Sequence, residues 1–325
     1  MRKFFAGWVV PLACSLYVAT AGAQSPAAYP TAAVRLIVPF APGGFTDVVA
    51  RQLAERLGVA LGQTVIVENR TGAGSTIGTD YVAKAPADGY TLALISTTHV
   101  ISPWLYKKLP YDPFKSFEPI TKLVDSPYVL VVNPNVPAKS VAELVALAKA
   151  KPGKLDYASS GNGSSQHLVG ALFASMTGVN INHIPYRGSG QALADVIGGQ
   201  VSMGFLGVTA ALPQIRAGRL RALAVTTRMR SRDLPDVPTL DEAGVKDFDA
   251  TIWLGLLAPA GTPKAIVDRL HDATATVMST DEVRAVLLEA GLTLSLSSQD
   301  EFRNLLKTES AKWGTVVEQT GANVN

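Results

Sequence analysis

Two segments of the sequence place glycines and hydroxyl side chains directly before a stretch with helical periodicity. They are Pro42-Gly43-Gly44-Phe45-Thr46-Asp47 and Ser159-Ser160-Gly161-Asn162-Gly163-Ser164-Ser165-Gln166-His167. Glycine lets the backbone approach a ligand closely, and the unpaired N–H groups at the start of a helix attract an anion. Serine hydroxyls can surround a carboxylate without a buried counter-charge. Ordinary helix caps would use the same residues, but two such segments in different halves of the chain favour one anion site shared between them.

Other residues could complete such a site. Ser96-Thr97-Thr98 ends another predicted strand and offers further hydroxyls. Arg187 could pair with a ligand carboxylate through two parallel hydrogen bonds, although a surface or interdomain ion pair is the commoner role of such an arginine. Phe205 could form a wall of a cleft, although an aromatic residue more often belongs to the core.

The sequence lacks the established signatures of enzymes. It contains no G-x-S-x-G nucleophile elbow and no G-x-x-x-x-G-K-[ST] phosphate loop, and Gly72-Ala73-Gly74-Ser75-Thr76-Ile77-Gly78 has the wrong spacing for a dinucleotide fingerprint. The four histidines lack metal-ligand spacing, so neither a metal nor a cofactor is expected. A Ser-His-Asp triad could still assemble in space, with Ser164 or Ser165 beside His167. A secreted α/β hydrolase is therefore the alternative from another functional class.

The elements that would position these residues alternate between strand and helix. Apolar and β-branched runs predict strands over residues 34–38, 64–68, 91–95, 129–132, 182–185, 203–206, 223–226 and 251–258, and helices follow most of them. Ser140 with Glu143, and Ser298 with Glu301, form capping boxes that predict two further helix starts. This alternation predicts a mostly parallel α/β sheet with its ligand at the carboxyl ends of the strands.

Length and composition indicate a folded chain of two domains or one large one, and two α/β domains fit the strand–helix alternation. The chain has 325 residues, of which 47% are hydrophobic and 17% are charged, so it can form a large core. Its formal net charge is +3 and it contains no basic tract, which argues against nucleic-acid binding. No flexible linker separates the two halves. We therefore expect two lobes that are joined by crossing strands and have a cleft between them.

The N-terminus has the pattern of a secretory signal peptide over residues 1–23. Arg2 and Lys3 precede an uncharged apolar stretch, and Ala21-Gly22-Ala23 is a small-x-small cleavage site. A transmembrane anchor would need about 20 apolar residues, which is more than this stretch provides. Cleavage after Ala23 would remove Cys14, the single cysteine, and would leave a mature chain in the periplasm.

Several stretches together resemble one family along essentially the whole mature chain. They are YPTAAVRLIVPFAPGGFTDVVAR, GQTVIVENRTGAGSTIGTDYVAKAPADGYTL, LYKKLPYDPFKSF, KPGKLDYASSGNGSSQHL, HIPYRGSGQALADVIGGQV and WLGLLAPAGTP. The resemblance is to the Bug receptors, the TctC-like substrate-binding proteins of tripartite tricarboxylate transporters. It implies a type II periplasmic-binding-protein fold with two α/β lobes. We expect residues 24–124 with 228–325 to form lobe 1 and residues 125–227 to form lobe 2.

The resemblance also implies a receptor that binds a small carboxylate without catalysis and delivers it to membrane permease subunits. Backbone amides and hydroxyls would hold the carboxylate, often with ordered water. The expected protein is a monomer, and its ligand is a di- or tricarboxylate or an aromatic carboxylate. A sensory receptor that presents its bound ligand to a signalling partner is a further alternative. The ligand-binding residues expected from the motifs and the resemblance are Gly43, Gly44, Phe45, Thr46, Asp47, Ser96, Thr97, Thr98, Ser160, Gly161, Gly163, Ser164, Ser165, His167, Arg187 and Phe205.

One departure from the family pattern bears on the ligand. Many relatives have an acid and an amide after the Gly-Phe pair, whereas this chain has Phe205-Leu206-Gly207-Val208. An acid at that position could accept a hydrogen bond from a ligand ammonium or hydroxyl group. Its replacement by Leu206 favours a carboxylate with a less polar aliphatic or aromatic body over an amino acid.

Overall fold

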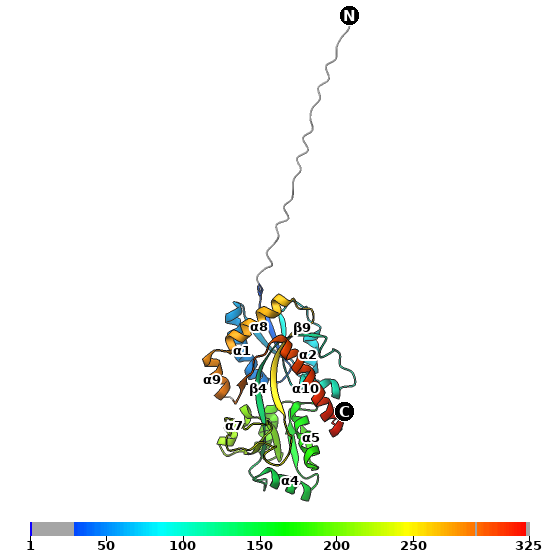
Figure 1. Ribbon diagram of the computed structural model, residues 1–325, viewed down its shortest axis with the longest axis vertical. Helices are drawn as coiled ribbons and strands as arrows, with labels where there is room; N and C mark the ends of the chain where they lie inside the picture. The colour runs from blue at the N-terminus through cyan, green and yellow to red at the C-terminus, as the bar shows by residue number, and fades with distance from the viewer. Residues whose placement is uncertain (2–28, 290, 323–325) are drawn as a thin grey trace.

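The computed structural model describes Met1, residues 29–289 and residues 291–322 (Figure 1). Apart from Met1, the predicted signal peptide lies outside these residues. The strands are β1 (Val34–Val38), β2 (Val65–Asn69), β3 (Thr91–Ser96), β4 (Phe117–Val132), β5 (Asp156–Ser159), β6 (Asn182–Pro185), β7 (Met203–Gly207), β8 (Arg221–Val225), β9 (Thr251–Pro259) and β10 (Thr293–Leu294). The helices are α1 (Phe45–Leu61), η1 (Ala73–Ser75), α2 (Thr76–Ala83), α3 (Thr98–Leu105), α4 (Val141–Ala150), α5 (Ser165–Thr177), α6 (Ser189–Ile197), α7 (Val208–Arg216), α8 (Lys264–Met278), α9 (Asp281–Glu289) and α10 (Gln299–Thr320). The predicted strands are present with bounds within two residues of the prediction, except that the strand predicted over residues 129–132 is only the end of β4.

One long strand connects the two halves of the sheet. The strand order is β2-β1-β3-β9-β4-β7-β5-β6, and β8 and β10 also pair with β4. Residues 117–127 of β4 pair with β9 in the first half, and residues 128–132 pair with β7 and β8 in the second half. Figure 1 shows β4 and β9 running side by side along the long axis between the upper and lower parts of the molecule. The expected crossing strand is therefore β4, with β9 beside it.

The sheet is mixed, which differs from the mostly parallel sheet that we predicted. β1 pairs in parallel with β2 and β3, and β5 pairs in parallel with β6 and β7. In contrast, β4 is antiparallel to β7, β8, β9 and β10, and β9 is antiparallel to β3. Strand–helix alternation indicates the parallel units. It gives no signal for two strands that cross between units.

Each half has its own apolar core. Val34, Leu36 and Leu53 belong to the core of the first half, and Val129 and Leu212 belong to that of the second. The strand residues in these cores are mostly valine and leucine, as expected for strands covered by helices on both faces. A third cluster includes Tyr128, Phe173, Trp253, Phe302 and Trp313, and it joins the crossing strands to α5 and α10. The two halves are therefore lobes with separate cores and a shared apolar junction.

The stretch before β9 packs with the second lobe. Val225 forms a parallel bridge with Thr239, and the Leu240 amide donates to the Val225 carbonyl at 2.9 Å. Leu234 belongs to the same core as Val129 and Val131. These contacts differ from the predicted assignment of residues 228–250 to lobe 1. The stretch has no regular helix or strand, so its pattern gave no sign of which lobe it covers.

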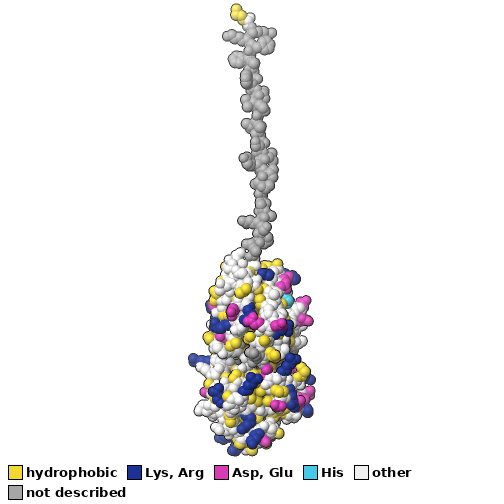
Figure 2. Space-filling model, turned by 90° about the vertical axis from the view of Figure 1, so that its left-hand side faces the viewer, with side chains coloured by type: hydrophobic (Ala, Val, Ile, Leu, Met, Phe, Trp, Pro, Cys, Tyr) yellow, Lys and Arg dark blue, Asp and Glu magenta, His cyan; other side chains and the backbone are white. Residues whose placement is uncertain are grey.

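On the face shown in Figure 2, no large patch of one charge is visible. Basic and acidic side chains are interspersed over the face in Figure 2. Within the described ranges, no helix has the length and apolar character needed to cross a bilayer.

Candidate functional site

A cavity of about 930 Å³ lies between the two lobes. It is lined by Pro39, Phe40, Ala41, Pro42, Gly44, Phe45, Thr46, Thr71, Gly72, Ala73, Gly74, Ser75, Ser96, Thr98, Tyr106, Tyr128, Ser160, Gly161, Asn162, Ser164, Ser165, Gln166, Tyr186, Arg187, Gly188, Ser189, Gly190, Gln191, Leu193, Leu206, Gly207, Thr209, Ala210 and Ile252. These residues include the first turns or caps of α1, α3, α5, α6 and α7. Each helix start has backbone N–H groups without an intrahelical acceptor and carries partial positive charge. The cavity therefore collects several helix starts that favour an anion.

The structure brings ten of the sixteen predicted site residues to this cavity. They are Gly44, Phe45, Thr46, Ser96, Thr98, Ser160, Gly161, Ser164, Ser165 and Arg187. The other six are not among the lining residues: Gly43, Asp47, Thr97, Gly163, His167 and Phe205. Several of these six support the loops that reach the cavity.

Asp47 fixes the first loop from inside the protein. Its Oδ2 accepts hydrogen bonds from the Gly43 amide at 2.9 Å and from Arg51 at 3.0 Å, and its Oδ1 accepts from Asn69 at 2.9 Å. Burial opposes ionisation, but the hydrogen bonds from Arg51, Gly43 and Asn69 outweigh it and lower the pKa of Asp47. The Gly43 amide is thus used within the protein, while the Gly44 to Thr46 segment faces the cavity.

Side-chain hydrogen bonds fix the second loop. Ser164 is the N-cap of α5, because its Oγ accepts from the His167 amide at 3.2 Å. Gln166 Oε1 accepts from the Ser160 amide at 2.8 Å. Ser165 Oγ shares a short hydrogen bond with Tyr128 Oη on the crossing strand β4. The loop is therefore tied to the crossing strand as well as to its own helix.

His167 lies in the interior, against a second histidine. Its ring stacks on His183 with 3.9 Å between centroids, and its Nδ1 accepts from the Gly163 amide at 3.3 Å. Burial lowers the pKa of His167 to about 4. Burial and the neighbouring His167 lower the pKa of His183 to about 3, and His183 Nε2 lies 2.6 Å from Ser159 Oγ. Both rings are therefore neutral near pH 7.

The geometry does not favour the hydrolase alternative. A nucleophilic serine would need its hydroxyl hydrogen-bonded to the His167 ring. In the described part of the chain, Ser164 Oγ instead bonds the His167 backbone and Ser165 Oγ bonds Tyr128. The pair that the alternative needs is not assembled in this structure.

Thr97 and Phe205 have structural roles. Thr97 Oγ1 accepts from the Trp253 amide at 3.2 Å, which joins the end of β3 to β9. Phe205 is fully buried and packs against Phe173 with 5.5 Å between ring centroids. Its neighbour Leu206 points to the other face of the strand, where it is also buried in the core but borders the cavity.

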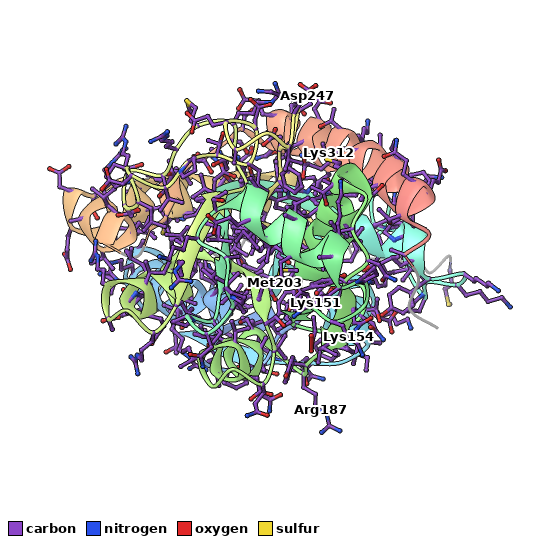
Figure 3. All side chains as sticks on the ribbon, turned by 90° about the horizontal axis from the view of Figure 1, so that it is seen from below. Lys151, Lys154, Arg187, Met203, Asp247 and Lys312 are labelled. Carbon is purple, nitrogen blue, oxygen red and sulfur yellow. The ribbon has the colours of Figure 1, made fainter. Side chains whose placement is uncertain are left out.

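Arg187 is the one charged residue among the described residues that line the cavity. It is exposed, and Figure 3 shows its side chain extending outward from the body of the molecule. The expected two-bond contact with a buried carboxylate is therefore not preformed.

Several residues that line the cavity were not predicted from the sequence. Residues 71–75 all line it, and so do Tyr106 on the first-lobe side and Tyr186 and Ser189 on the second-lobe side. The repeated glycines at positions 72, 74 and 78 were the available signal. These glycines do not fit the dinucleotide fingerprint, and that mismatch gave no indication that they line a cavity.

The lining combines hydrogen-bond donors with apolar surface. Backbone amides and hydroxyls surround the helix starts, while Phe40, Leu193, Leu206 and Ile252 supply apolar contact. None of the lining residues is an Asp or a Glu. An anion with an apolar body suits this arrangement, because the donors replace its hydration without a buried counter-ion.

Comparisons with known proteins agree with this geometry. The model of the tripartite tricarboxylate transporter family receptor (TctC) matches residues 49–322. Protein BugT of Bordetella pertussis is 40% identical over 314 residues, which cover 95% of this chain and 96% of BugT. The structure of R. palustris Rpa4515 with adipate has a TM-score of 0.87 and 37% identity, and covers 91% of this chain and 99% of that chain. MatC from Rhodopseudomonas palustris with bound malate has a TM-score of 0.85 and 32% identity, and covers 89% of this chain and 100% of that chain. These structural similarities confirm the expected periplasmic-binding-protein fold.

Proposed function

This chain belongs to the tripartite tricarboxylate transporter receptor family, and from that premise we propose that it binds a small carboxylate between its two lobes as a periplasmic receptor. The observation that carries the proposal is a cavity lined by five helix starts and no acidic side chain. Adipate and malate in the two similar structures are both dicarboxylates, which supports a ligand of this class.

The first-lobe contacts in this proposal come from Gly44, Phe45 and Thr46, with Ser96 and Thr98 beside them. The amides at the start of α1 donate to one carboxylate oxygen, because they have no acceptor within the helix. Asp47 keeps these amides in position through its bond to Gly43.

The second-lobe contacts come from Ser160, Gly161, Ser164 and Ser165. Binding to one lobe and closure onto the other then complete the donor set around the carboxylate. A ligand that contacts both lobes stabilises the closed form, because it binds that form more tightly than the open one.

The apolar wall selects the body of the ligand. Leu206 and Ile252 line the cavity where a polar ligand body would lose its hydration without compensation. We therefore propose an aliphatic or aromatic carboxylate in preference to an amino acid.

Export and delivery complete the proposal. The predicted leader over residues 1–23 directs the chain to the periplasm and is cleaved after Ala23. The closed, ligand-bound receptor then delivers its carboxylate to permease subunits of the tripartite tricarboxylate type, the role that the family name describes.

A thermal-shift screen of residues 24–325 tests the proposal. The panel contains adipate, malate, citrate, benzoate and a set of amino acids, and titration calorimetry then measures each positive. A ligand that binds only the folded state raises the melting temperature by mass action. A selective rise with one carboxylate class is expected. No rise with any carboxylate contradicts the proposed function, and a rise with amino acids alone contradicts the proposed ligand class.

A further inference from the structure

The glycine-rich turn Gly72–Ser75 has an unusual backbone that the proposed contacts leave unexplained. Gly72, Ala73, Gly74 and Ser75 have φ angles of 129°, 45°, 59° and 79°. Side chains rarely tolerate this region, so Ala73 and Ser75 are strained. Such residues persist only where their surroundings hold them, and they cluster at functional sites. All four residues line the interlobe cavity.

Helix α2 holds the turn in this conformation. Thr76 Oγ1 donates to the Ala73 carbonyl at 2.8 Å, and Thr79 Oγ1 donates to the Ser75 carbonyl at 2.9 Å. Thr79 is fully buried, so its bond is shielded from water. The turn is therefore a fixed part of the first lobe.

Gly74 is the residue at which this turn meets the second lobe. A Cβ atom added to Gly74 would lie 3.4 Å from the carbonyl oxygen of Asn162, in the loop before α5. On the first-lobe side, the same atom would lie 2.8 Å from Tyr106 Oη. On the first-lobe side, position 74 therefore has room for a glycine and little more, whereas the distance to Asn162 is an ordinary van der Waals contact.

A second contact between the lobes also uses glycines. A Cβ atom added to Gly44 would lie 3.4 Å from Ser189 Oγ, and one added to Gly188 would lie 3.5 Å from the Cβ of Ala41. All of these residues line the cavity. The lobes thus pack closely at two places beside the ligand space, and glycines lie at both.

We propose that the Gly72–Ser75 turn acts as a latch. In the closed receptor, Gly74 packs against the Asn162 carbonyl, and this contact sets the dissociation rate of the ligand. The latch rests on the proposed receptor function. The strained turn provides a rigid surface for the second lobe to pack against, and glycine at position 74 allows the two lobes to close fully. A side chain there would hold the lobes apart after the ligand has entered, so it would accelerate release and leave capture unchanged.

The Gly74→Asn variant tests the latch, because asparagine tolerates a left-handed backbone better than most residues. Gly62→Asn is the matched control, since Gly62 also has a positive φ of 68° and its added Cβ has nothing within 4 Å. Stopped-flow kinetics with adipate should show a dissociation rate raised about 10-fold or more in Gly74→Asn, with the association rate within about twofold of the unmodified protein. Gly62→Asn should change neither rate.

An interlobe distance gives a second measurement. Fluorophores on Lys84→Cys in the first lobe and Lys151→Cys in the second can be placed uniquely, because residues 24–325 contain no cysteine. With adipate, Gly74→Asn should leave the labels farther apart than the unmodified background or Gly62→Asn does. An unchanged dissociation rate together with an unchanged distance would overturn the latch. A ligand-free melting temperature that falls in Gly74→Asn but not in Gly62→Asn would also overturn the latch. The turn would then only stabilise the first lobe.

The two proposals fail in different ways. If the unmodified protein binds no carboxylate, the receptor proposal fails. The ligand-free distance then still tests the contact, and equal distances in Gly74→Asn and the unmodified background contradict the latch.

Discussion

Leu206 stands at the end of β7 and lines the cavity, where a charge would act directly on a bound anion. Leu206→Asp and Leu206→Asn have nearly the same size and both introduce polarity, so they differ mainly in charge. We expect Leu206→Asp to bind adipate about 10-fold more weakly than Leu206→Asn, because a carboxylate in this low-dielectric wall repels the ligand. Calorimetric titration of both variants measures the difference. Equal affinities would place the ligand anion away from Leu206.

Arg187 should act on ligand capture, because its exposed side chain extends outward and it is the single charge among the described lining residues. Arg187→Gln is expected to slow association with adipate about two- to fivefold at low ionic strength, with little change in dissociation. The difference should shrink in salt, as charges on a protein surface are screened. Arg219→Gln removes another exposed charge, one that does not line the cavity, and it should leave the association rate unchanged. A faster dissociation in Arg187→Gln would instead indicate a direct contact in the closed form.

Residue types could be predicted to form the site, but their orientations could not. Gly44 and Ser164 were found from glycines and hydroxyls before a helix, and both line the cavity. Asp47 has the same local pattern, but its carboxylate turns inward because Arg51 and Asn69 lie behind it. Arg51 lies one turn further along α1, but the Asn69 contact depends on how α1 packs against β2, which the segment itself does not encode.

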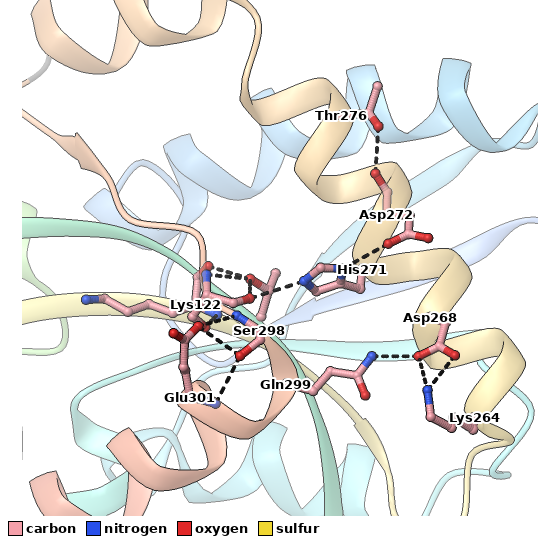
Figure 4. A network of polar contacts seen from close by, with 11 residues as sticks. Lys122, Lys264, Asp268, His271, Asp272, Thr276, Ser298, Gln299 and Glu301 are labelled. Atoms are coloured by element: carbon pink, nitrogen blue, oxygen red, sulfur yellow. Dashed lines mark hydrogen bonds and ion pairs between the residues drawn. The ribbon is translucent and has the colours of Figure 1, made fainter.

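At the scale of elements, the capped N-terminus of α10 also connects this helix to α8. Ser298 Oγ accepts from the Glu301 amide at 3.3 Å, and Glu301 Oε2 accepts from the Ser298 amide at 2.8 Å, so the predicted capping box is confirmed. Gln299 Nε2 then donates to Asp268 Oδ1 at 2.9 Å, which connects α10 to α8 (Figure 4). His271 makes a second connection from α8 to the carbonyl of Ser297 at 3.2 Å.

Removing this cap should cost stability without affecting ligand binding. Ser298→Ala leaves the Glu301 amide without its acceptor, at a cost of about 1 kcal/mol. For a chain of this size, that loss lowers the melting temperature by about 2–4 °C. Ser298→Asp restores an acceptor and should recover most of the loss. Calorimetry measures the melting temperature, and a weakened adipate affinity in Ser298→Ala would show that the cap is coupled to the cavity.

The elements that depend on local pattern were predicted, whereas those that depend on distant pairing were not. Strands β1 and β6 have the predicted bounds. The first part of β4 was missed, since Pro119, Lys122 and Pro127 interrupt its apolar pattern. Its pairing with β9, more than a hundred residues later, supplies the order that the local sequence lacks. The antiparallel centre of the sheet could not be predicted for the same reason.

At the scale of the whole molecule, buried histidines in both lobes couple stability to pH. Burial lowers the pKa of His99, whose Nε2 donates to the Pro113 carbonyl at 2.8 Å, to about 4. The pKa of His167 is also lowered to about 4, and that of His183 to about 3. In the unfolded chain, each histidine has a pKa near 6.5. Between about pH 6.5 and 4 the unfolded state therefore binds more protons than the folded state, and the free energy of unfolding must fall as the pH is lowered.

This window differs from the one set by the carboxylates. Asp47 and Glu68 have lowered pKa values, so the stabilisation that they provide is lost only as the pH falls below about 4.5. We therefore expect the melting temperature to decline already between pH 6.5 and 4.5, with each buried histidine contributing on the order of 2 kcal/mol at the lower end of its range. His183→Gln should make this decline shallower, because it removes one of the groups that takes up a proton on unfolding. Differential scanning calorimetry in a series of buffers measures both slopes. Equal slopes of melting temperature against pH in His183→Gln and the unmodified protein would contradict this prediction. They would mean that His167 and His183 take up protons without unfolding. The loop before α5 would then have to open in acid to hydrate the two rings.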